Sequence, residues 1–320
     1  MAYRVDSYHI NIGVGDAAIH VLAKPNINNP AILPECVKVV WIDAGKSGGS
    51  SKVITTLENI EPLYKTRTGG FKIDVVIVTH WDSDHYGGFN SFMEQTTKVV
   101  KYFRYGTNNT PRTKFLTSAT MIDKCPAFVK GARANNGTLK IDNTVVADVY
   151  YGTSLLGADI FSDTDLKKIS PGHPTPGSVN DIHDLITNMA GGGRPAMFCI
   201  AIEGELIGPS SQTRVLSGTM WVDKVTLTNE SSLAAVIAWP NGRVSHYFAG
   251  DLNAAAECAL VEWLRPAWEN RRIPSMKCSH HGACSSTPTT MIDNFRPYNI
   301  IISAGSMHNH PGDLASPTSA

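Results

Sequence analysis

The feature that most constrains the fold is an apolar run followed at once by a polar cluster. Residues 73–79 are almost continuously β-branched, which predicts a central strand covered on both faces. Directly after this run come His80, Asp82, Asp84 and His85. Imidazole and carboxylate groups are common ligands of zinc, manganese and iron, and a loop at the carboxyl end of a strand can turn several of them inward. The segment therefore predicts a metal site at the end of a buried strand.

A layered α/β pattern surrounds this strand. Residues 8–22 alternate around a Gly-x-Gly-Asp turn and predict a hairpin, while residues 37–42 predict a buried strand and residues 52–64 an amphipathic helix. Further along, we expect a hairpin over 232–251, a helix over 254–265, a strand leading into residue 280 and a final buried strand over 298–303. Residues 101–217 are rich in Asn, Thr, Gly and Pro and are interpreted as a loop-rich insertion that shapes a substrate cleft.

Two other predicted strands also end in metal-ligand residue types. Asp251 follows one strand and a glycine, and His280 and His281 follow another. Each has an ordinary alternative, because an Asp in this place is also a common helix N-cap and a His pair also occurs in polar turns. Three such strand ends in one chain favour metal chemistry over the alternatives.

Composition limits the classes of partner. The 320 residues include 28 Lys and Arg against 28 Asp and Glu, and this zero net charge argues against binding of long nucleic acid, which requires a basic excess. The six cysteines form no C-x-x-C pair, which favours reduced thiols over a disulfide framework. No signal peptide and no apolar stretch of about 20 residues is present, so we expect a cytoplasmic protein without a membrane partner. The oligomeric state is left open.

Four motifs together resemble the metallo-β-lactamase superfamily. They are residues 41–45 (WIDAG), 79–88 (THWDSDHYGG), 249–251 (AGD) and 279–282 (SHHG). More narrowly, the chain resembles the hydrolase domain of bacterial DNA-uptake competence proteins and its stand-alone relatives, which also carry a Gly-x-Gly-Asp hairpin, an Asn-x-x-Ser-Leu segment and a C-terminal Asn-His-Pro motif, here at 13–16, 229–233 and 309–311. The resemblance covers the chain except for about 101–217. It implies an αββα sandwich, two mixed β-sheets flanked by helices, formed as a single domain by residues 1–320.

The resemblance also implies a centre for two divalent ions, zinc or manganese. The ligands that it implies are His80, Asp82, Asp84, His85, Asp251 and one of His280 and His281. The first two would bind one ion, the next two the other, and Asp251 would bridge both. Asp82 stands where the family commonly has His, and this harder ligand shifts the preference toward manganese or a looser zinc site.

The remaining histidines are assigned weaker roles. His310 is a candidate contact to substrate or to developing charge, with a surface turn as its alternative. His173 lies in a Pro/Gly segment similar to the one that supplies a further ligand in the family, although an ordinary loop is the preferred interpretation. The hairpin residues His9 and His20, together with His183 and His246, are interpreted as structural or surface residues.

These observations predict a metal-dependent hydrolase that uses a metal-activated hydroxide, oriented by Asp84 as proton acceptor. No protein nucleophile is needed, and the chain has no Gly-x-Ser-x-Gly elbow. From the resemblance we expect a phosphodiester substrate: a nucleotide, an oligonucleotide or a related small phosphodiester. The alternatives are a carboxylic ester, lactone or β-lactam hydrolase on the same site, or a non-catalytic metal-binding scaffold.

Overall fold

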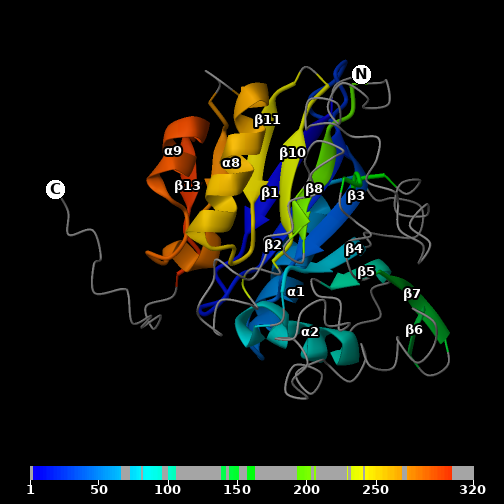
Figure 1. Ribbon diagram of the computed structural model, residues 1–320. Helices are drawn as coiled ribbons and strands as arrows, with labels where there is room; N and C mark the ends of the chain where they lie inside the picture. Colours follow the sequence, from blue (N-terminus) through cyan, green and yellow to red (C-terminus); the bar gives the residue numbers. More distant parts are fainter. Residues whose placement is uncertain are drawn as a thin grey trace.

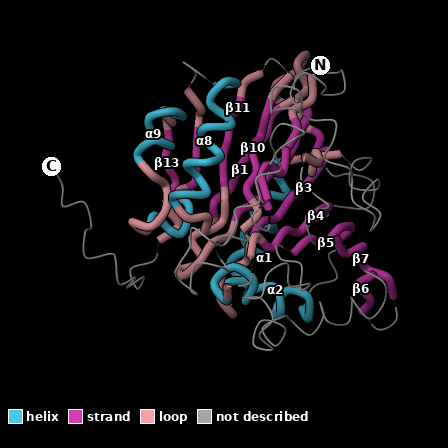
Figure 2. Tube along the Cα trace, viewed as in Figure 1, coloured by secondary structure: helices cyan, strands magenta, loops and turns pink. Residues whose placement is uncertain are grey.

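The computed structural model describes residues 3–65, 73–80, 82–95, 100–105, 138–141, 144–150, 157–162, 193–202, 205–206, 229, 232–240, 242–268 and 272–304. Two β-sheets form the centre of this part of the chain, and helices lie outside them (Figures 1 and 2). Within these ranges no helix is long and apolar enough to cross a membrane.

The first sheet has the order β1-β2-β3-β4-β5-β7-β6. Its strands are β1 (Arg4–His9), β2 (Ala18–Lys24), β3 (Glu35–Ile42), β4 (Ile73–Val78), β5 (Val100–Tyr105), β6 (Thr138–Ile141) and β7 (Thr144–Tyr150). Strands β3, β4 and β5 run parallel, whereas β1-β2 is an antiparallel hairpin. All six residues of β4 are buried, as the continuous β-branched run predicts for a strand covered on both faces.

The second sheet has the order β13-β12-β11-β10-β8-β9. Its strands are β8 (Ala196–Ile202), β9 (Glu205–Leu206), β10 (Ala234–Ala238), β11 (Val244–Phe248), β12 (Ser275–Lys277) and β13 (Asn299–Ile301). Strands β11, β12 and β13 are parallel, and β10 is antiparallel to β11. The sheet is therefore mixed, like the first.

Three apolar clusters hold the layers together. One lies between the sheets and joins residues such as Leu22 and Ile77 to Ile237 and Phe248. A second packs α1 (Gly49–Ile60) and α2 (Ser83–Gln95) on the outer face of the first sheet. A third packs α8 (Ala254–Trp268) and α9 (Thr289–Phe295) on the outer face of the second sheet. The predicted fold class, an α/β sandwich of two mixed sheets flanked by helices, is confirmed.

Three local predictions differ from the structure. The segment after β4 is not all loop, because α2 begins at Ser83 and carries Asp84 and His85 in its first turn. The range 101–217, interpreted as a loop-rich insertion, includes most of β5 and the whole of β8, and all seven residues of β8 are buried between β10 and β9 in the second sheet. The last strand is an edge strand rather than a buried one, which leaves Ile300 45% exposed.

The topology brings several loops to one edge of the sandwich. Carboxyl ends of parallel strands lie at the same edge of a sheet, and here Asp43 follows β3 and His80 follows β4. The hairpin adds Asp16, because β2 is antiparallel to β3 and its first residue, Ala18, pairs with Ile42. In the second sheet, Asp251 follows β11 and the segment after β12 carries His280 and His281.

Candidate metal centre

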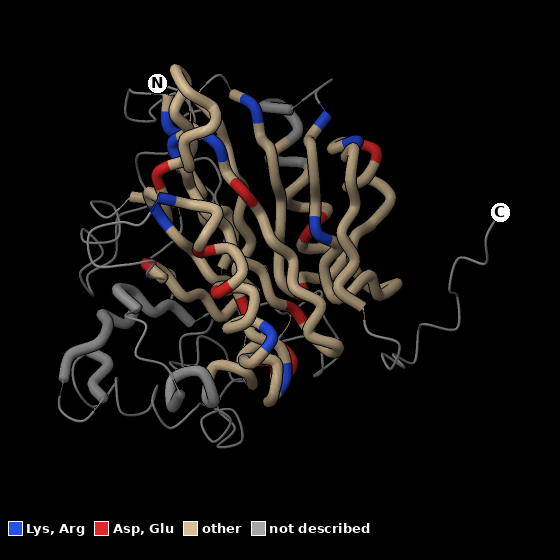
Figure 3. The backbone as a smooth tube through the Cα atoms, turned by 180° about the vertical axis from the view of Figure 1, so that it is seen from behind, with Lys and Arg blue, Asp and Glu red and all other residues tan. Residues whose placement is uncertain are grey.

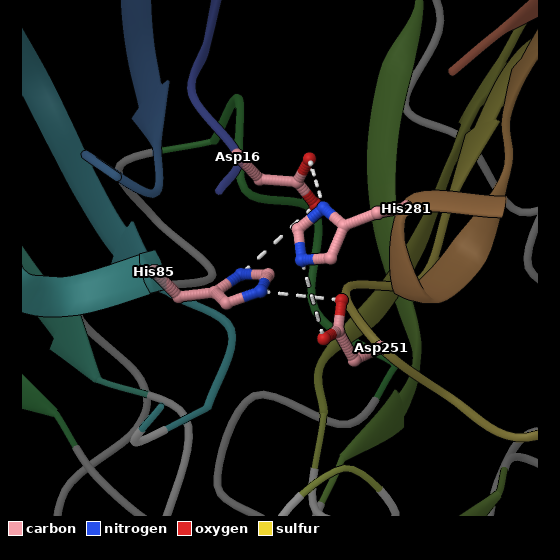
Figure 4. Close-up of side chains that lie close together, drawn as sticks. All are labelled: Asp16, His85, Asp251 and His281. Carbon is pink, nitrogen blue, oxygen red and sulfur yellow. Dashed lines mark ion pairs between the residues drawn. The ribbon is translucent and has the colours of Figure 1, made fainter. Parts of the chain in front are cut away.

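Imidazoles and carboxylates from both sheets meet at this edge. Asp16, His85, Asp251 and His281 each offer one ligand atom, and these atoms all lie within 4.8 Å of one another. All four residues are buried, and Figure 4 shows their side chains turned toward a common centre from four separate segments. Among the described residues, this is the group of His, Cys, Asp and Glu side chains placed closely enough to share a metal ion.

Asp251 lies at the middle of the group. Its Oδ1 is 3.2 Å from Nε2 of His85, and its Oδ2 is 3.6 Å from Nε2 of His281 and 3.7 Å from Nε2 of His80. Ligands that share one ion at the usual bond length of about 2.0–2.2 Å are about 3.3 Å apart in tetrahedral geometry. The observed separations are therefore close to those of ligands around an ion.

Outer partners orient two of the imidazoles. Nδ1 of His85 is 2.7 Å from Oδ2 of Asp43, and Nδ1 of His281 is 3.0 Å from the carbonyl oxygen of Ser303. Because each Nδ1 donates its proton outward, each Nε2 is the nitrogen that can offer a lone pair to a metal ion once the ion displaces its proton. Histidine ligands usually have this second hydrogen bond, which fixes both the tautomer and the ring orientation.

The imidazole of His80 is oriented in the same way, by a hydroxyl group. Thr79 donates its Oγ1 hydrogen to Asp43 over 2.7 Å, so Oγ1 accepts from Nδ1 of His80, 3.1 Å away. Nε2 of His80 is then a lone-pair donor, and it is buried without a hydrogen-bond partner in the described part of the chain. A buried nitrogen of this kind is costly unless something binds it. The donor set and this nitrogen both fit a divalent cation.

The charges show which kind of ligand the centre favours. Burial alone lowers the pKa of His281, but the carboxylates of Asp251, Asp16 and Asp84 raise it to about 9. Burial likewise opposes protonation of His85, yet Asp251 and Asp43 raise its pKa well above the usual value. Burial raises the pKa of Asp251, but the neighbouring imidazoles hold it well below its ordinary range. An excess of carboxylates that draws protons onto imidazoles also attracts metal cations.

A buried lysine balances part of this negative charge. The ammonium group of Lys277 forms an ion pair with Oδ2 of Asp16 and donates to the carbonyl oxygen of Cys278 over 2.9 Å. Burial alone lowers the pKa of Lys277, but Asp16 and Asp251 raise it, so the side chain stays charged. Asp16 is therefore shared between the Lys277 ion pair and the edge of the metal group.

Two glycines allow the close approach of these loops. Gly15 has φ +96°, and a Cβ there would lie 1.8 Å from the carbonyl oxygen of Asp84. Gly250 has φ +52°, and a Cβ would lie 2.9 Å from Cβ of Thr79. A side chain at either position would push the two segments apart. The positive φ values also disfavour residues other than glycine at both positions.

The segment after β12 is itself held in an unusual conformation. His280 and His281 have φ of 47° and 55°, the left-handed region that costs free energy for residues other than glycine. The preceding Ser279 donates its hydroxyl to buried Glu257 of α8 over 2.6 Å, and Tyr247 donates to the same carboxylate oxygen over 3.0 Å. Burial raises the pKa of Glu257 to about 7 despite these bonds. This anchoring directs His281, rather than His280, into the group.

The structure places the other sequence-predicted residues as follows. Oδ2 of Asp84 is 3.3 Å from Nε2 of His281, and Oδ2 of Asp82 is 3.7 Å from Nε2 of His80. The Asp82 side chain is 36% exposed, at the solvent side of the group. Nε2 of His280 is 3.9 Å from Oδ2 of Asp251, so His280 lies at the margin. His173 and His310 lie outside the described residues.

Three contributors were not predicted as site residues. They are Asp16, Asp43 and Lys277. The first two had a signal, since Asp16 ends the Gly-x-Gly-Asp turn and Asp43 directly follows a predicted strand. Lys277 had none, because a lysine near a strand end is ordinarily a solvated residue.

Replacement of Asp43 by Asn tests the outer support. An amide cannot accept from His85, Thr79 Oγ1 and Thr79 N as the carboxylate does, so the His85 ring loses its fixed tautomer. We expect metal affinity to fall about 10–100-fold, as for other outer partners of histidine ligands. Competition with a metal chelator measures this change. Equal affinity in Asp43→Asn and the parent protein would show that Asp43 has only a structural role.

Comparison with protein families gives one match, which covers part of the chain. The model of the family described as the metallo-β-lactamase superfamily matches residues 39–180, somewhat less than half of the chain. This match includes the His80–His85 cluster but not Asp251 or His281. No curated protein sequence matches the chain.

Comparison with solved structures gives several matches with low TM-scores. One is a HARLDQ-motif mutant of the metallo-β-lactamase from Cronobacter sakazakii, with 13% identity, coverage of 84% of this chain and 75% of that chain, and a TM-score of 0.32. Another is zinc-bound PqqB from Methylobacterium extorquens, with 10% identity, coverage of 82% and 59%, and a TM-score of 0.34. A third is a mutant flavo di-iron protein from Thermotoga maritima, with 10% identity, coverage of 83% and 48%, and a TM-score of 0.27.

Proposed function

We propose that the chain is a metal-dependent hydrolase of the metallo-β-lactamase superfamily that binds two divalent ions, zinc or manganese, and cleaves a small phosphodiester. The observation that carries this proposal is the arrangement around Asp251, where Nε2 atoms of His80, His85 and His281 lie 3.2–3.7 Å from one buried carboxylate. The family match over residues 39–180 supports the superfamily and the metal-dependent hydrolase class, but not the choice of substrate.

The geometry suggests how the residues would divide between the ions. His80 and Asp82 would hold one ion, while Asp84, His85 and His281 would hold the other. Asp251 would contribute to both, because its Oδ1 faces His85 and its Oδ2 faces His80 and His281. His280 is close enough to Asp251 to serve as a further ligand after a small side-chain rotation.

The ions would supply the electrophilic chemistry, since divalent cations lower the pKa of water and polarise a scissile P=O or C=O bond. The protein would supply orientation and proton transfer. Asp84 is the candidate base, because its side chain is 19% exposed while Asp251 is only 3% exposed. His281 and His85 hold the pKa of Asp84 well below its usual range despite burial, so this carboxylate is ionised when no metal is bound.

A small substrate is favoured by the charge distribution. The formal net charge is zero, and both Lys or Arg and Asp or Glu segments occur along the described backbone in Figure 3. Binding of long nucleic acid draws most of its affinity from concentrated positive charge. The phosphodiester class itself rests on the resemblance of the motifs to the competence-protein hydrolase domain, and an ester, lactone or β-lactam is the alternative.

The test is metal reconstitution followed by a substrate panel. Metal-stripped protein receives Zn²⁺ or Mn²⁺ and is assayed on a chromogenic phosphodiester, ester, lactone and β-lactam. We expect more than one equivalent of metal per chain and metal-dependent turnover that is fastest on the phosphodiester. Asp84→Asn should lower this turnover by about 10²–10⁴-fold, as for loss of a general base. Faster cleavage of the ester, lactone or β-lactam would establish the alternative substrate, and failure to bind metal would refute the proposal.

A further inference from the structure

Three histidines gather next to the metal centre, in the layer between the sheets. They are His9 at the end of β1, His20 in β2 and His246 in β11. Their ring centroids are 5.2 Å (His9 to His246), 5.3 Å (His20 to His246) and 6.0 Å (His9 to His20) apart. The neighbouring positions on the same faces of these strands are apolar, including Leu22 and Phe248 of the inter-sheet cluster. Imidazoles in such a layer are costly unless their nitrogens are bound.

Hydrogen bonds fix the direction of two rings. Ser275 donates its hydroxyl to the carbonyl oxygen of Ser245 over 3.3 Å, so its Oγ accepts from Nδ1 of His246 at 2.7 Å. Nε2 of His246 therefore carries a lone pair. Nδ1 of His20 is 2.8 Å from Oγ of Ser7, which leaves its Nε2 as the second nitrogen of that ring. This is the pattern of outer hydrogen bonds that accompanies histidine ligands of metals.

The inner nitrogens have no hydrogen-bond partner among the described residues. Nε2 of His20, Nε2 of His246 and both nitrogens of His9 are buried without a hydrogen bond to any described residue. Burial lowers the pKa of His9 to about 4 and that of His246 to about 3, and it lowers the pKa of His20 as well. The three rings are therefore neutral at physiological pH, and neutral imidazole is the form that binds metal.

The spacing of the rings suits one ion. Imidazoles that bind one ion through nitrogens at about 2.0–2.1 Å have ring centroids about 5–6 Å apart, and all three observed distances lie in this range. The nitrogens themselves are not yet as close as those of the Asp251 group, which all lie within 4.8 Å. Binding of one ion by all three rings would require a change in side-chain orientation, and no hydrogen bond to a described residue holds either nitrogen of His9.

We propose that His9, His20 and His246 form a separate metal site, which takes zinc or another divalent ion that prefers imidazole ligands. The trio itself contains no carboxylate, so it selects zinc, copper, nickel or cobalt over manganese and magnesium. Three protein ligands leave one coordination position open on a four-coordinate ion. A cavity of about 20 Å³ lined by His9 and His20 can hold one water molecule at that position.

His9 lies next to both a surface groove and the first centre. It lines the groove together with Ser7, Asn11 and Lys52. The small cavity is lined on its other side by Asp16 and Lys277, the ion pair beside the Asp251 group. Occupation of the trio would thus fix the hairpin that carries Asp16.

The test counts zinc in variants of the full chain. His20→Leu removes one nitrogen donor from the layer that already contains Leu22, and Phe248→Leu is the matched control, because Phe248 stacks on His20 at 5.6 Å but offers no ligand. After dialysis against Zn²⁺, we expect His20→Leu to hold about one equivalent less than the parent protein, with no loss in the control. His246→Gln provides a second variant should His20→Leu fail to fold. Mn²⁺ binding should be the same in all of them.

An Asp251→Asn background separates this proposal from the proposed function. There, the zinc that remains should disappear when His20→Leu is added, and Co²⁺ should give the visible absorption of a nitrogen-rich four-coordinate site only while the trio is intact. Loss of zinc in His20→Leu without any loss in Asp251→Asn would support the trio and refute the first centre. Equal zinc content with and without His20, in both backgrounds, would overturn the trio site.

Discussion

Replacement of Asp251 by Asn is expected to have the largest effect on activity. The variant should lose metal from the Asp251 group and should lower turnover by at least on the order of 10³-fold. The reason is that this carboxylate is the one that three imidazole nitrogens face within 3.7 Å. The fold should be preserved, because the Asp251 backbone N–H still donates to Ser232 Oγ over 3.1 Å.

Metal content and turnover on the best substrate, measured together, test this expectation. Asp159→Asn is the matched control, since Asp159 is equally buried but pairs with Arg194 over 2.6 Å away from the Asp251 group. The control should keep its metal per folded chain even where its stability falls. Normal metal content in the Asp251→Asn variant would show that metal binding does not depend on this carboxylate.

Replacement of Lys277 by Met is expected to have the largest effect on stability. Asp16 would then lose its closest cationic partner and keep only the longer contacts to Nδ1 of His281 and of His85, at 3.5 and 4.0 Å. Breaking a buried ion pair costs about 3–5 kcal/mol, which is the upper bound expected here. The free energy of unfolding of metal-free protein, measured with urea, should fall by up to this amount. Metal-free protein is used because a bound cation would partly replace the ammonium charge.

The double variant Asp16→Asn/Lys277→Met provides the control. It removes both charges, so most of the lost stability should return, since replacing a buried pair as a whole is often nearly neutral. If the double variant were as unstable as Lys277→Met alone, the loss would come from packing of the lysine side chain rather than from the broken ion pair with Asp16.

The sequence by itself determined the central strand and the candidate ligands that directly follow it. The β-branched run of β4 predicted a strand buried on both faces, and His80, Asp84 and His85 follow it so closely that they share one end of that strand. Asp251 could be predicted in the same way, from a strand and a glycine. The strand could be predicted because side-chain periodicity is a local property of the chain. The edge strand β13 shows the limit, since its apolar residues do not reveal whether another strand lies beside it.

The tertiary structure decided which distant groups meet. The choice of His281 over His280 depends on two left-handed residues and on the bond from Ser279 to Glu257 of a separate helix. Asp43 became the partner of His85 only because β3 and β4 are parallel neighbours. His9, His20 and His246 look like isolated residues in the sequence and become one cluster when β2 packs across β11. Contacts between strands of different sheets depend on topology and register, which no local pattern encodes.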